Sequence, residues 1–232
     1  MPVNVEAYRQ IRKELDANSV GLVAVSKTKP IKEIRELYGL GHRDFGENYV
    51  QEMVEKANIL PGDTRWHFIG HLQTNKVKLI APFVQLIHGV DSLKLLKEIN
   101  KQAEKAGRVI DCLLQVHIAR EETKFGLDEA ELDALIKKIP AAGLKNVRIC
   151  GLMGMASFTE DIDAVRTEFR NLKVIFDKLR TYNSQPACRQ ARFTTLSMGM
   201  SSDYRVAVEE GSNLVRIGSL LFGERPKNDT TK

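Results

Sequence analysis

The stretch Gly21-Leu-Val-Ala-Val-Ser-Lys27 is a short run of apolar, largely aliphatic residues that closes on a lysine. A run of this length and composition predicts a buried β-strand. Thr28, Lys29 and Pro30 interrupt the run, and an amphipathic helical pattern follows over 31–40. The first unit of the chain is therefore a strand followed by a helix, with a lysine at the carboxyl end of the strand.

The same unit recurs along nearly the whole chain. Further apolar runs of strand length lie at 43–47, 65–70, 84–89, 109–118, 147–153, 192–197 and 213–218. Further patterns with helical spacing lie at 48–58, 73–81, 92–106, 128–138, 160–182 and 203–210. An additional helix is predicted over 4–17, because Ile11 and Leu15 stand four residues apart on one face. Residues suited to begin helices are Asp91-Ser92, Asp128 and Asp161.

About eight strand-then-helix units in 232 residues predict an α/β fold, a single parallel (β/α)8 TIM barrel. The run Val109–Ile118 is nearly continuous in apolar character, which is typical of a strand buried on both faces. An open doubly wound sheet is the alternative, but no glycine-rich dinucleotide fingerprint follows the first strand. No linker or low-complexity tract divides the chain, so we expect one domain over 1–232, with 226–232 as a disordered tail.

Composition narrows the classes of function. The net charge of +5 comes from interspersed residues without a basic block, so we expect no nucleic-acid partner. We expect no membrane segment, because no apolar run approaches bilayer length and the N-terminus lacks a signal-peptide pattern. Cys112, Cys150 and Cys188 form no CxxC pair, which favours a cytoplasmic location. His67 and His71 are four apart without an evident third ligand, so we expect no metal site.

The barrel constrains where chemistry occurs, because reactive groups in this fold lie at the carboxyl ends of the strands and phosphate often binds the loops after strands seven and eight. Lys27 lies at the end of strand one. Strand seven is followed by the hydroxyl-rich loop Ser197–Asp203, and strand eight by Gly218 and Ser219. A partly desolvated lysine can form a Schiff base. The arrangement suggests a phosphorylated aldehyde as ligand, with a lysine that merely reaches solvent as the alternative.

These segments resemble the pyridoxal phosphate homeostasis proteins, which are single-barrel relatives of the alanine racemase N-terminal domain. The resemblance covers residues 5–225 and is carried by six motifs in order. They are VAVSKTKP at 23–30, FGENYVQE at 45–52, WHFIGHLQTNK at 66–76, GLMGM at 151–155, SMGMSSDY at 197–204 and VRIGSLLFG at 215–223.

The resemblance implies roles for individual residues. Lys27 would form the Schiff base with pyridoxal 5′-phosphate, and Asn48 would lie near the ring. The phosphate would be held by Ser197, Gly218 and Ser219, where the family often has threonine at the last position. Arg216 would face the pyridine nitrogen. A guanidinium there can only donate, which weakens the ring as an electron sink.

The favoured function is a pyridoxal phosphate-binding protein of intracellular cofactor homeostasis, monomeric and without robust turnover, that passes the cofactor to pyridoxal phosphate-dependent apoenzymes. An amino-acid racemase is one alternative. It would need a proton donor opposite the lysine, for which Tyr49 and Tyr204 are candidates, since we expect no second domain after strand eight. A cofactor-free Schiff-base lyase acting on sugar phosphates is the other.

Overall fold

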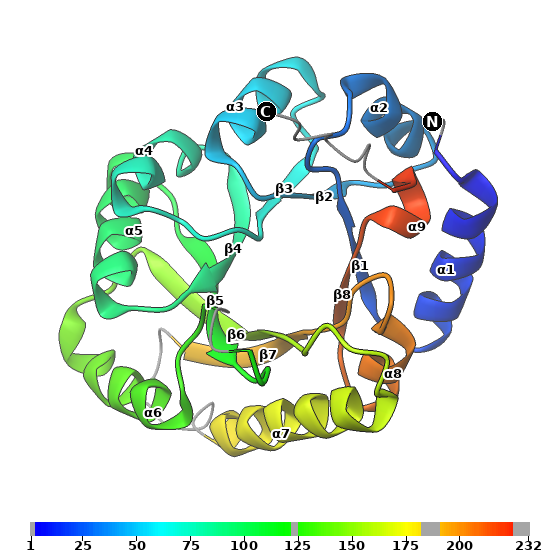
Figure 1. Cartoon of the computed structure of the whole chain (residues 1–232). Coiled ribbons are helices and arrows are strands. Elements are labelled where there is room, and N and C mark those ends of the chain that lie inside the picture. The colour runs from blue at the N-terminus through cyan, green and yellow to red at the C-terminus, as the bar shows by residue number, and fades with distance from the viewer. Residues whose placement is uncertain (1–2, 122–124, 182–190, 225–232) are drawn as a thin grey trace, which may run out of the picture.

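Eight parallel strands close into a barrel in the order β1 to β8 (Figure 1). The computed structural model describes residues 3–121, 125–181 and 191–224. The predicted disordered tail at 226–232 lies outside these ranges. The strands are β1 (Gly21–Val25), β2 (Asp44–Glu47), β3 (Arg65–Phe68), β4 (Val84–Val90), β5 (Ile110–His117), β6 (Val147–Met155), β7 (Ala191–Ser197) and β8 (Leu214–Ile217). The predicted barrel is confirmed.

Helices surround the strands and connect them. They are α2 (Ile31–Gly39), α3 (Val50–Ile59), α4 (Val77–Ile80), α5 (Leu93–Lys105), α6 (Glu129–Lys138), α7 (Ile162–Arg180) and α8 (Tyr204–Glu209). Short 3-10 turns cover Thr74–Lys76 and Pro140–Ala142, and the four-residue helix α9 (Ser219–Phe222) follows β8. The additional helix α1 (Val5–Ala17) lies in the outer ring between α8 and α2 (Figure 1). It therefore covers the place where the last strand meets the first.

The predicted helix starts are confirmed by their caps. Asp128 forms a reciprocal capping box with Glu131 at the start of α6, Asp161 accepts a hydrogen bond from the amide of Ala164, and Ser92 accepts one from Leu95. Predicted strand ends are less accurate, because β1 stops at Val25 rather than at residue 27. The Ser26 amide still donates to the Gly46 carbonyl of β2, but the turn begins at Lys27, so apolar content alone overestimates the strand.

Side chains alternate between two cores. The larger one lies between strands and helices and includes the fully buried rings of Phe45, Phe68 and Phe169. Inside the barrel, the apolar cluster is much smaller and contains Leu86, Leu113 and Met153. The remaining inward positions of the strands are largely polar and include His67, His88, Gln115, Ser197 and Arg216. A polar interior of this kind requires a partner for each buried group.

One glycine shows how closely two strands approach. A Cβ atom on Gly151 would lie 1.7 Å from the carbonyl oxygen of Thr195, so only glycine fits where β6 changes register against β7.

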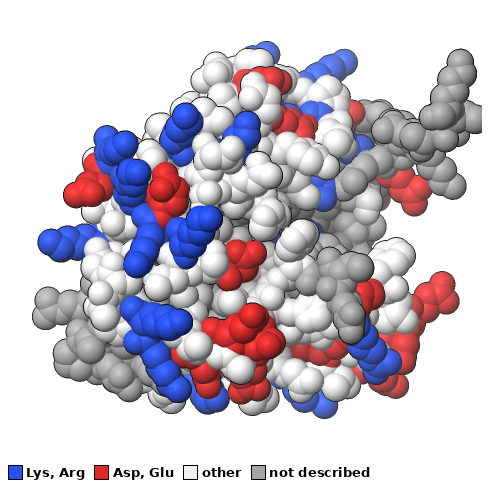
Figure 2. Space-filling model, turned by 60° about the vertical axis from the view of Figure 1, so that its left-hand side comes forward, with Lys and Arg blue, Asp and Glu red and all other residues white. Residues whose placement is uncertain are grey.

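On the outer surface, the face formed by α4, α5 and α6 carries basic and acidic side chains near one another (Figure 2). Among the described residues, no helix combines the length and apolar character needed to cross a membrane.

Candidate functional site

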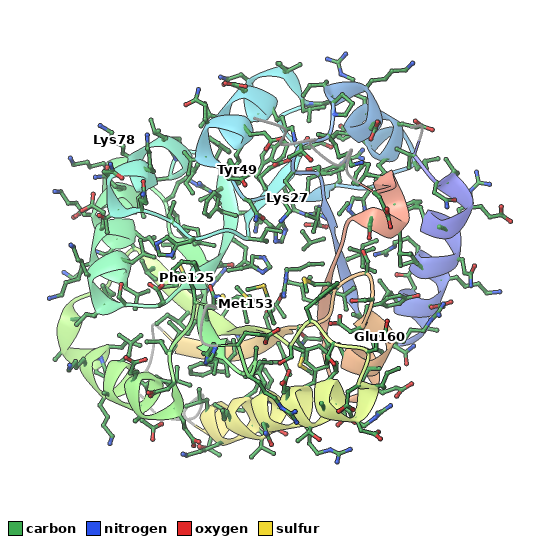
Figure 3. All side chains as sticks on the ribbon, viewed as in Figure 1. Lys27, Tyr49, Lys78, Phe125, Met153 and Glu160 are labelled. Carbon is green, nitrogen blue, oxygen red and sulfur yellow. The ribbon has the colours of Figure 1, made fainter. Side chains whose placement is uncertain are left out.

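A cavity of about 670 Å³ opens at the carboxyl ends of the strands. Its volume lies within the range of about 300–1,000 Å³ that is usual for small-molecule sites. The predicted site residues that line it are Lys27, Asn48, Arg216, Gly218 and Ser219. Figure 3 shows Lys27 on the inner side of the ring of strands, whereas Lys78 lies on the outer surface. The fold therefore brings together five residues from the ends of β1, β2 and β8.

Strand alternation explains why Lys27 faces the cavity. Val25 lines the cavity, whereas Ala24 belongs to the outer core. The same alternation continues into the turn, where Ser26 faces outward toward α3 and Lys27 faces inward. The amine thus has a cavity wall beside its stem, while its neighbour contacts the helical layer.

A buried ionic network lies behind Lys27. Lys56 Nζ is 2.8 Å from Glu47 Oε1 and 2.7 Å from Glu52 Oε1, and its side chain is only 6% exposed. Lys56 also donates a hydrogen bond of 2.7 Å to the carbonyl of Ser26, and the Ser26 hydroxyl donates to Glu47 Oε1 at 2.6 Å. The residue before Lys27 is therefore held by both its backbone and its side chain. We call Glu47, Glu52 and Lys56 the lysine clamp.

The lysine clamp also holds the residue after Lys27. The amide of Thr28 donates to Glu52 Oε1 at 2.6 Å. Thr28 has φ 64°, in the left-handed region that a β-branched residue rarely adopts. This hydrogen bond therefore stabilises an unfavourable backbone conformation, which turns the chain immediately after the reactive amine.

Electrostatics within the lysine clamp are asymmetric. Burial raises the pKa of Glu47, while Lys56 and the Ser26 hydroxyl act in the opposite direction. Lys56 and Ser26 both donate to the same oxygen of Glu47, so the carboxyl is ionised while Lys56 is present. The second oxygen, Oε2, is buried without a hydrogen-bond partner among the described residues. The clamp was not predicted from the sequence, although the four-residue spacing of Glu52 and Lys56 is typical of a helical ion pair.

Arg216 is buried at the base of the cavity, with 4% of its surface exposed. Its Nη1 donates to the Ser197 carbonyl at 2.9 Å and to Ser197 Oγ at 2.7 Å, and its Nη2 donates to the Gly154 carbonyl at 3.0 Å. Burial lowers the pKa of Arg216 to about 10, while the charge of Asp203 opposes the shift. The guanidinium therefore remains a fixed cation at neutral pH.

Ser197, predicted to hold the phosphate, does not line the cavity. Its side chain is completely buried, contacts Arg216 and is not part of the cavity wall. The hydroxyl-rich loop after β7 reaches the cavity four residues later, through Ser201 and Ser202. Ser201 Oγ also accepts a hydrogen bond of 3.3 Å from the amide of Gly218. Ser197 is the last residue of β7, and its side chain faces the barrel interior below the mouth of the cavity. Its position inside the predicted strand 192–197, and not in the loop after it, could have indicated this.

Asn48 supplies an unfilled acceptor at the cavity. Its Oδ1 atom is buried and has no hydrogen-bond partner among the described residues. A Cβ atom on Gly70 would lie 2.4 Å from the Asn48 carbonyl oxygen, so glycine allows the loop after β3 to pack directly against Asn48. A buried polar atom of this kind is usually satisfied by a ligand or by water.

The two tyrosines considered as proton donors do not line the cavity. The Tyr204 hydroxyl donates to Glu14 Oε2 at 2.8 Å, and the Tyr49 side chain is 61% exposed. His67 and His71 contact different residues. His67 forms a hydrogen bond with His88, whereas His71 stacks on Phe125. Within the described ranges, no group of three potential ligands could hold a metal ion.

Comparisons with known proteins agree with this geometry. The family model described as alanine racemase, N-terminal domain, matches residues 5–226, which defines the class of the barrel. The pyridoxal phosphate homeostasis protein of Aquifex aeolicus is 44% identical over 210 residues, with 90% of this chain and 88% of that protein covered. The human protein of the same name is 41% identical over 230 residues, with 95% and 82% covered. The chain belongs to the pyridoxal phosphate homeostasis protein family.

Solved structures lead to the same family. PipY of Synechococcus elongatus PCC7942 with pyridoxal phosphate bound has a TM-score of 0.83 at 37% identity, with 94% of this chain and 99% of PipY covered. An alanine racemase of Clostridium difficile 630 has a TM-score of 0.74 at 14% identity, with 98% of this chain but 59% of the racemase covered. The racemase likeness shows the fold alone.

Proposed function

We propose that this chain binds pyridoxal 5′-phosphate as a Schiff base on Lys27 and serves in homeostasis of that cofactor rather than in amino-acid turnover. The observation that carries the proposal is a lysine facing a cavity that also contains serine hydroxyls and a buried arginine. Its family relatives are named for the same cofactor, and PipY was solved with it bound. When bound, the cofactor supplies an aldehyde that reacts with an amine.

The residues of the cavity fit the chemical parts of this cofactor. Hydroxyl groups of Ser201, Ser202 and Ser219 can donate to phosphate oxygens, and Gly218 allows the backbone to approach closely. The unfilled Oδ1 of Asn48 can accept a hydrogen bond from a ring substituent. We assign the phosphate to these three serines in place of Ser197.

Arg216 supports a binding role over a catalytic one. Facing the pyridine nitrogen, a cationic guanidinium donates a hydrogen bond and disfavours protonation of the ring, so the ring withdraws electrons poorly. We further propose a monomeric, cytoplasmic, single-domain protein that passes the cofactor to pyridoxal phosphate-dependent apoenzymes. Interconversion of alanine enantiomers by the purified protein at enzymatic rates would contradict this proposal.

The absorption spectrum of the purified protein incubated with pyridoxal phosphate tests the Schiff base. We expect a visible band that borohydride bleaches, with a matching increase in intact mass that peptide mapping places on Lys27. Lys27→Ala should abolish the band while retaining the circular dichroism of the fold. Lys78→Ala, a lysine exposed on the outer surface, is the matched control and should retain the band. A band that persists in Lys27→Ala excludes the assignment.

A further inference from the structure

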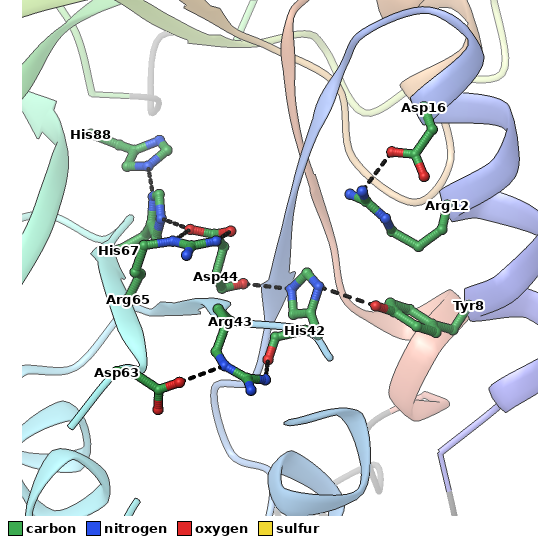
Figure 4. Close-up of polar contacts among 10 residues, drawn as sticks. All are labelled: Tyr8, Arg12, Asp16, His42, Arg43, Asp44, Asp63, Arg65, His67 and His88. Carbon is green, nitrogen blue, oxygen red and sulfur yellow. Dashed lines mark hydrogen bonds and ion pairs between the residues drawn. The ribbon is translucent and has the colours of Figure 1, made fainter. Parts of the chain in front are cut away.

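A line of polar side chains crosses the barrel interior from the amino ends of the strands to Arg216. His67 Nε2 lies 3.0 Å from Asp44 Oδ1, and His67 Nδ1 lies 3.0 Å from His88 Nε2. His88 Nδ1 lies 3.3 Å from Ser197 Oγ, to which Arg216 donates. Figure 4 shows the part from Asp44 through His67 to His88. We call these five residues the polar column.

If both rings are neutral, the two ends of the polar column allow only one direction for every hydrogen bond in it. A guanidinium only donates and a carboxylate only accepts. Because Arg216 donates to Ser197 Oγ, the hydroxyl proton is available to His88 Nδ1. A neutral ring that accepts at Nδ1 carries its proton on Nε2, so His88 donates to His67 Nδ1. By the same argument, His67 donates from Nε2 to Asp44, so the column assigns the Nε2–H tautomer to both rings.

Arg216 needs this connection because its own acceptors are neutral. They are the Ser197 and Gly154 carbonyls and the Ser197 hydroxyl. A buried cation is costly unless a negative charge compensates it. Asp203 contributes one such charge through space. The polar column adds hydrogen-bond dipoles that run from Arg216 to the Asp44 carboxylate, which also forms an ion pair with Arg65.

Burial disfavours a charge on His88. The ring is fully buried, and burial lowers its pKa well below the usual value, with His67 and then Arg216 acting in the same direction. Burial alone would raise the pKa of Asp44, but hydrogen bonds from Arg65 and His67 hold it below its ordinary range. Asp44 and Arg65 line a second cavity, of about 350 Å³, at the amino ends of the strands. The column therefore links the two ends of the barrel.

We propose that the polar column stabilises the Arg216 cation through hydrogen bonds aligned toward Asp44, which makes His67 and His88 positioning residues for the guanidinium at the cofactor cavity. The column itself is a property of the cofactor-free protein. Its effect on pyridoxal phosphate rests on the proposed function. An arginine that loses the column should reorient or move toward Asp203, and the hydrogen bond it offers to the ring nitrogen should weaken.

Nitrogen-15 NMR of the imidazole rings in the cofactor-free protein tests the column directly. The chain has five histidines, so each ring can be assigned. In slightly alkaline buffer we expect His67 and His88 to carry their proton on Nε2. An Nδ1–H tautomer on either ring reverses a hydrogen bond and overturns the proposal. This measurement needs neither a variant nor a bound cofactor, so its outcome is independent of the proposed function.

Substitutions test the coupling to Arg216. His88→Leu should remove the distinct guanidinium N–H signals of Arg216 in the cofactor-free protein and weaken pyridoxal phosphate binding about tenfold, as expected for loss of a hydrogen bond to a charged group. His88→Gln keeps a donor and an acceptor and should restore most of both. His117→Gln is the matched control, because that ring bonds the Glu121 carbonyl outside the column. Unchanged Arg216 signals in a folded His88→Leu protein overturn the proposal.

Discussion

Lys56 Nζ lies 2.7 Å from the carbonyl oxygen of Ser26, the residue immediately before Lys27. A buried amine is thus placed behind Lys27, on the helical side of β1. The two lysines have different roles because strand alternation directs Lys27 into the cavity and Ser26 toward α3. Lys56 is paired with two carboxylates and holds the turn, whereas Lys27 faces the cavity.

Lys56→Met should destabilise the protein by about 3–5 kcal/mol, because it leaves the buried Glu47 carboxylate without its cation. The expected result is a lower midpoint of denaturant unfolding at neutral pH. Formation of the Schiff base with pyridoxal phosphate should also slow, since the turn that carries Lys27 loses its support. Equilibrium unfolding and stopped-flow absorbance measure the two effects.

The double variant Glu47→Gln/Lys56→Met is the control for that substitution. It removes both charges, so it should recover part of the stability that Lys56→Met alone loses. Glu47→Gln is also measured alone. If the losses of unfolding free energy in the two single variants add up to the loss in the double variant, the ion pair does not couple these residues.

Ser201→Ala and Ser219→Ala should each weaken retention of pyridoxal phosphate by about 1–2 kcal/mol, typical of a hydrogen bond to a charged group. Neither should prevent reaction at Lys27, because both hydroxyls lie on the loops after β7 and β8. Equilibrium dialysis gives the affinity, and borohydride reduction gives the extent of reaction. If both variants retain pyridoxal phosphate as well as the unsubstituted protein does, these loops do not bind its phosphate.

His42 should make stability depend on pH. Burial lowers the pKa of His42 to about 4 in the folded protein, against its usual 6.5. As the pH falls from about 6.5 to 4, the unfolded chain gains a proton that the folded protein does not accept, so stability decreases by roughly 3 kcal/mol over this window. Thermal unfolding across that range should show a shallower decrease for His42→Gln. His71→Gln, at the surface, should keep the full slope, and equal slopes in all three proteins would refute the assignment.

Gly151→Ala should prevent stable folding, because its Cβ would lie 1.7 Å from the Thr195 carbonyl oxygen in the adjacent strand. Backbone cannot yield there without separating β6 from β7. Gly39→Ala is the matched substitution in open space at the end of α2, where we expect no loss of stability. Soluble yield and thermal unfolding compare the two, and a Gly151→Ala protein as stable as the original would contradict the packing described.

The sequence alone determined the barrel, the family and most of the cavity, since periodicity and short motifs are local properties of the chain. Lys27, Gly218 and Ser219 could be predicted because each follows a strand whose end must lie at the same mouth, and the family resemblance added Asn48. Tertiary structure alone decided how buried polar groups are partnered. Ser197 contacts Arg216 rather than the cavity, and Glu47, from a different strand, holds the turn before Lys27. Such pairings depend on which side chains a closed barrel brings within about 3 Å of one another, and no spacing along the chain encodes that distance.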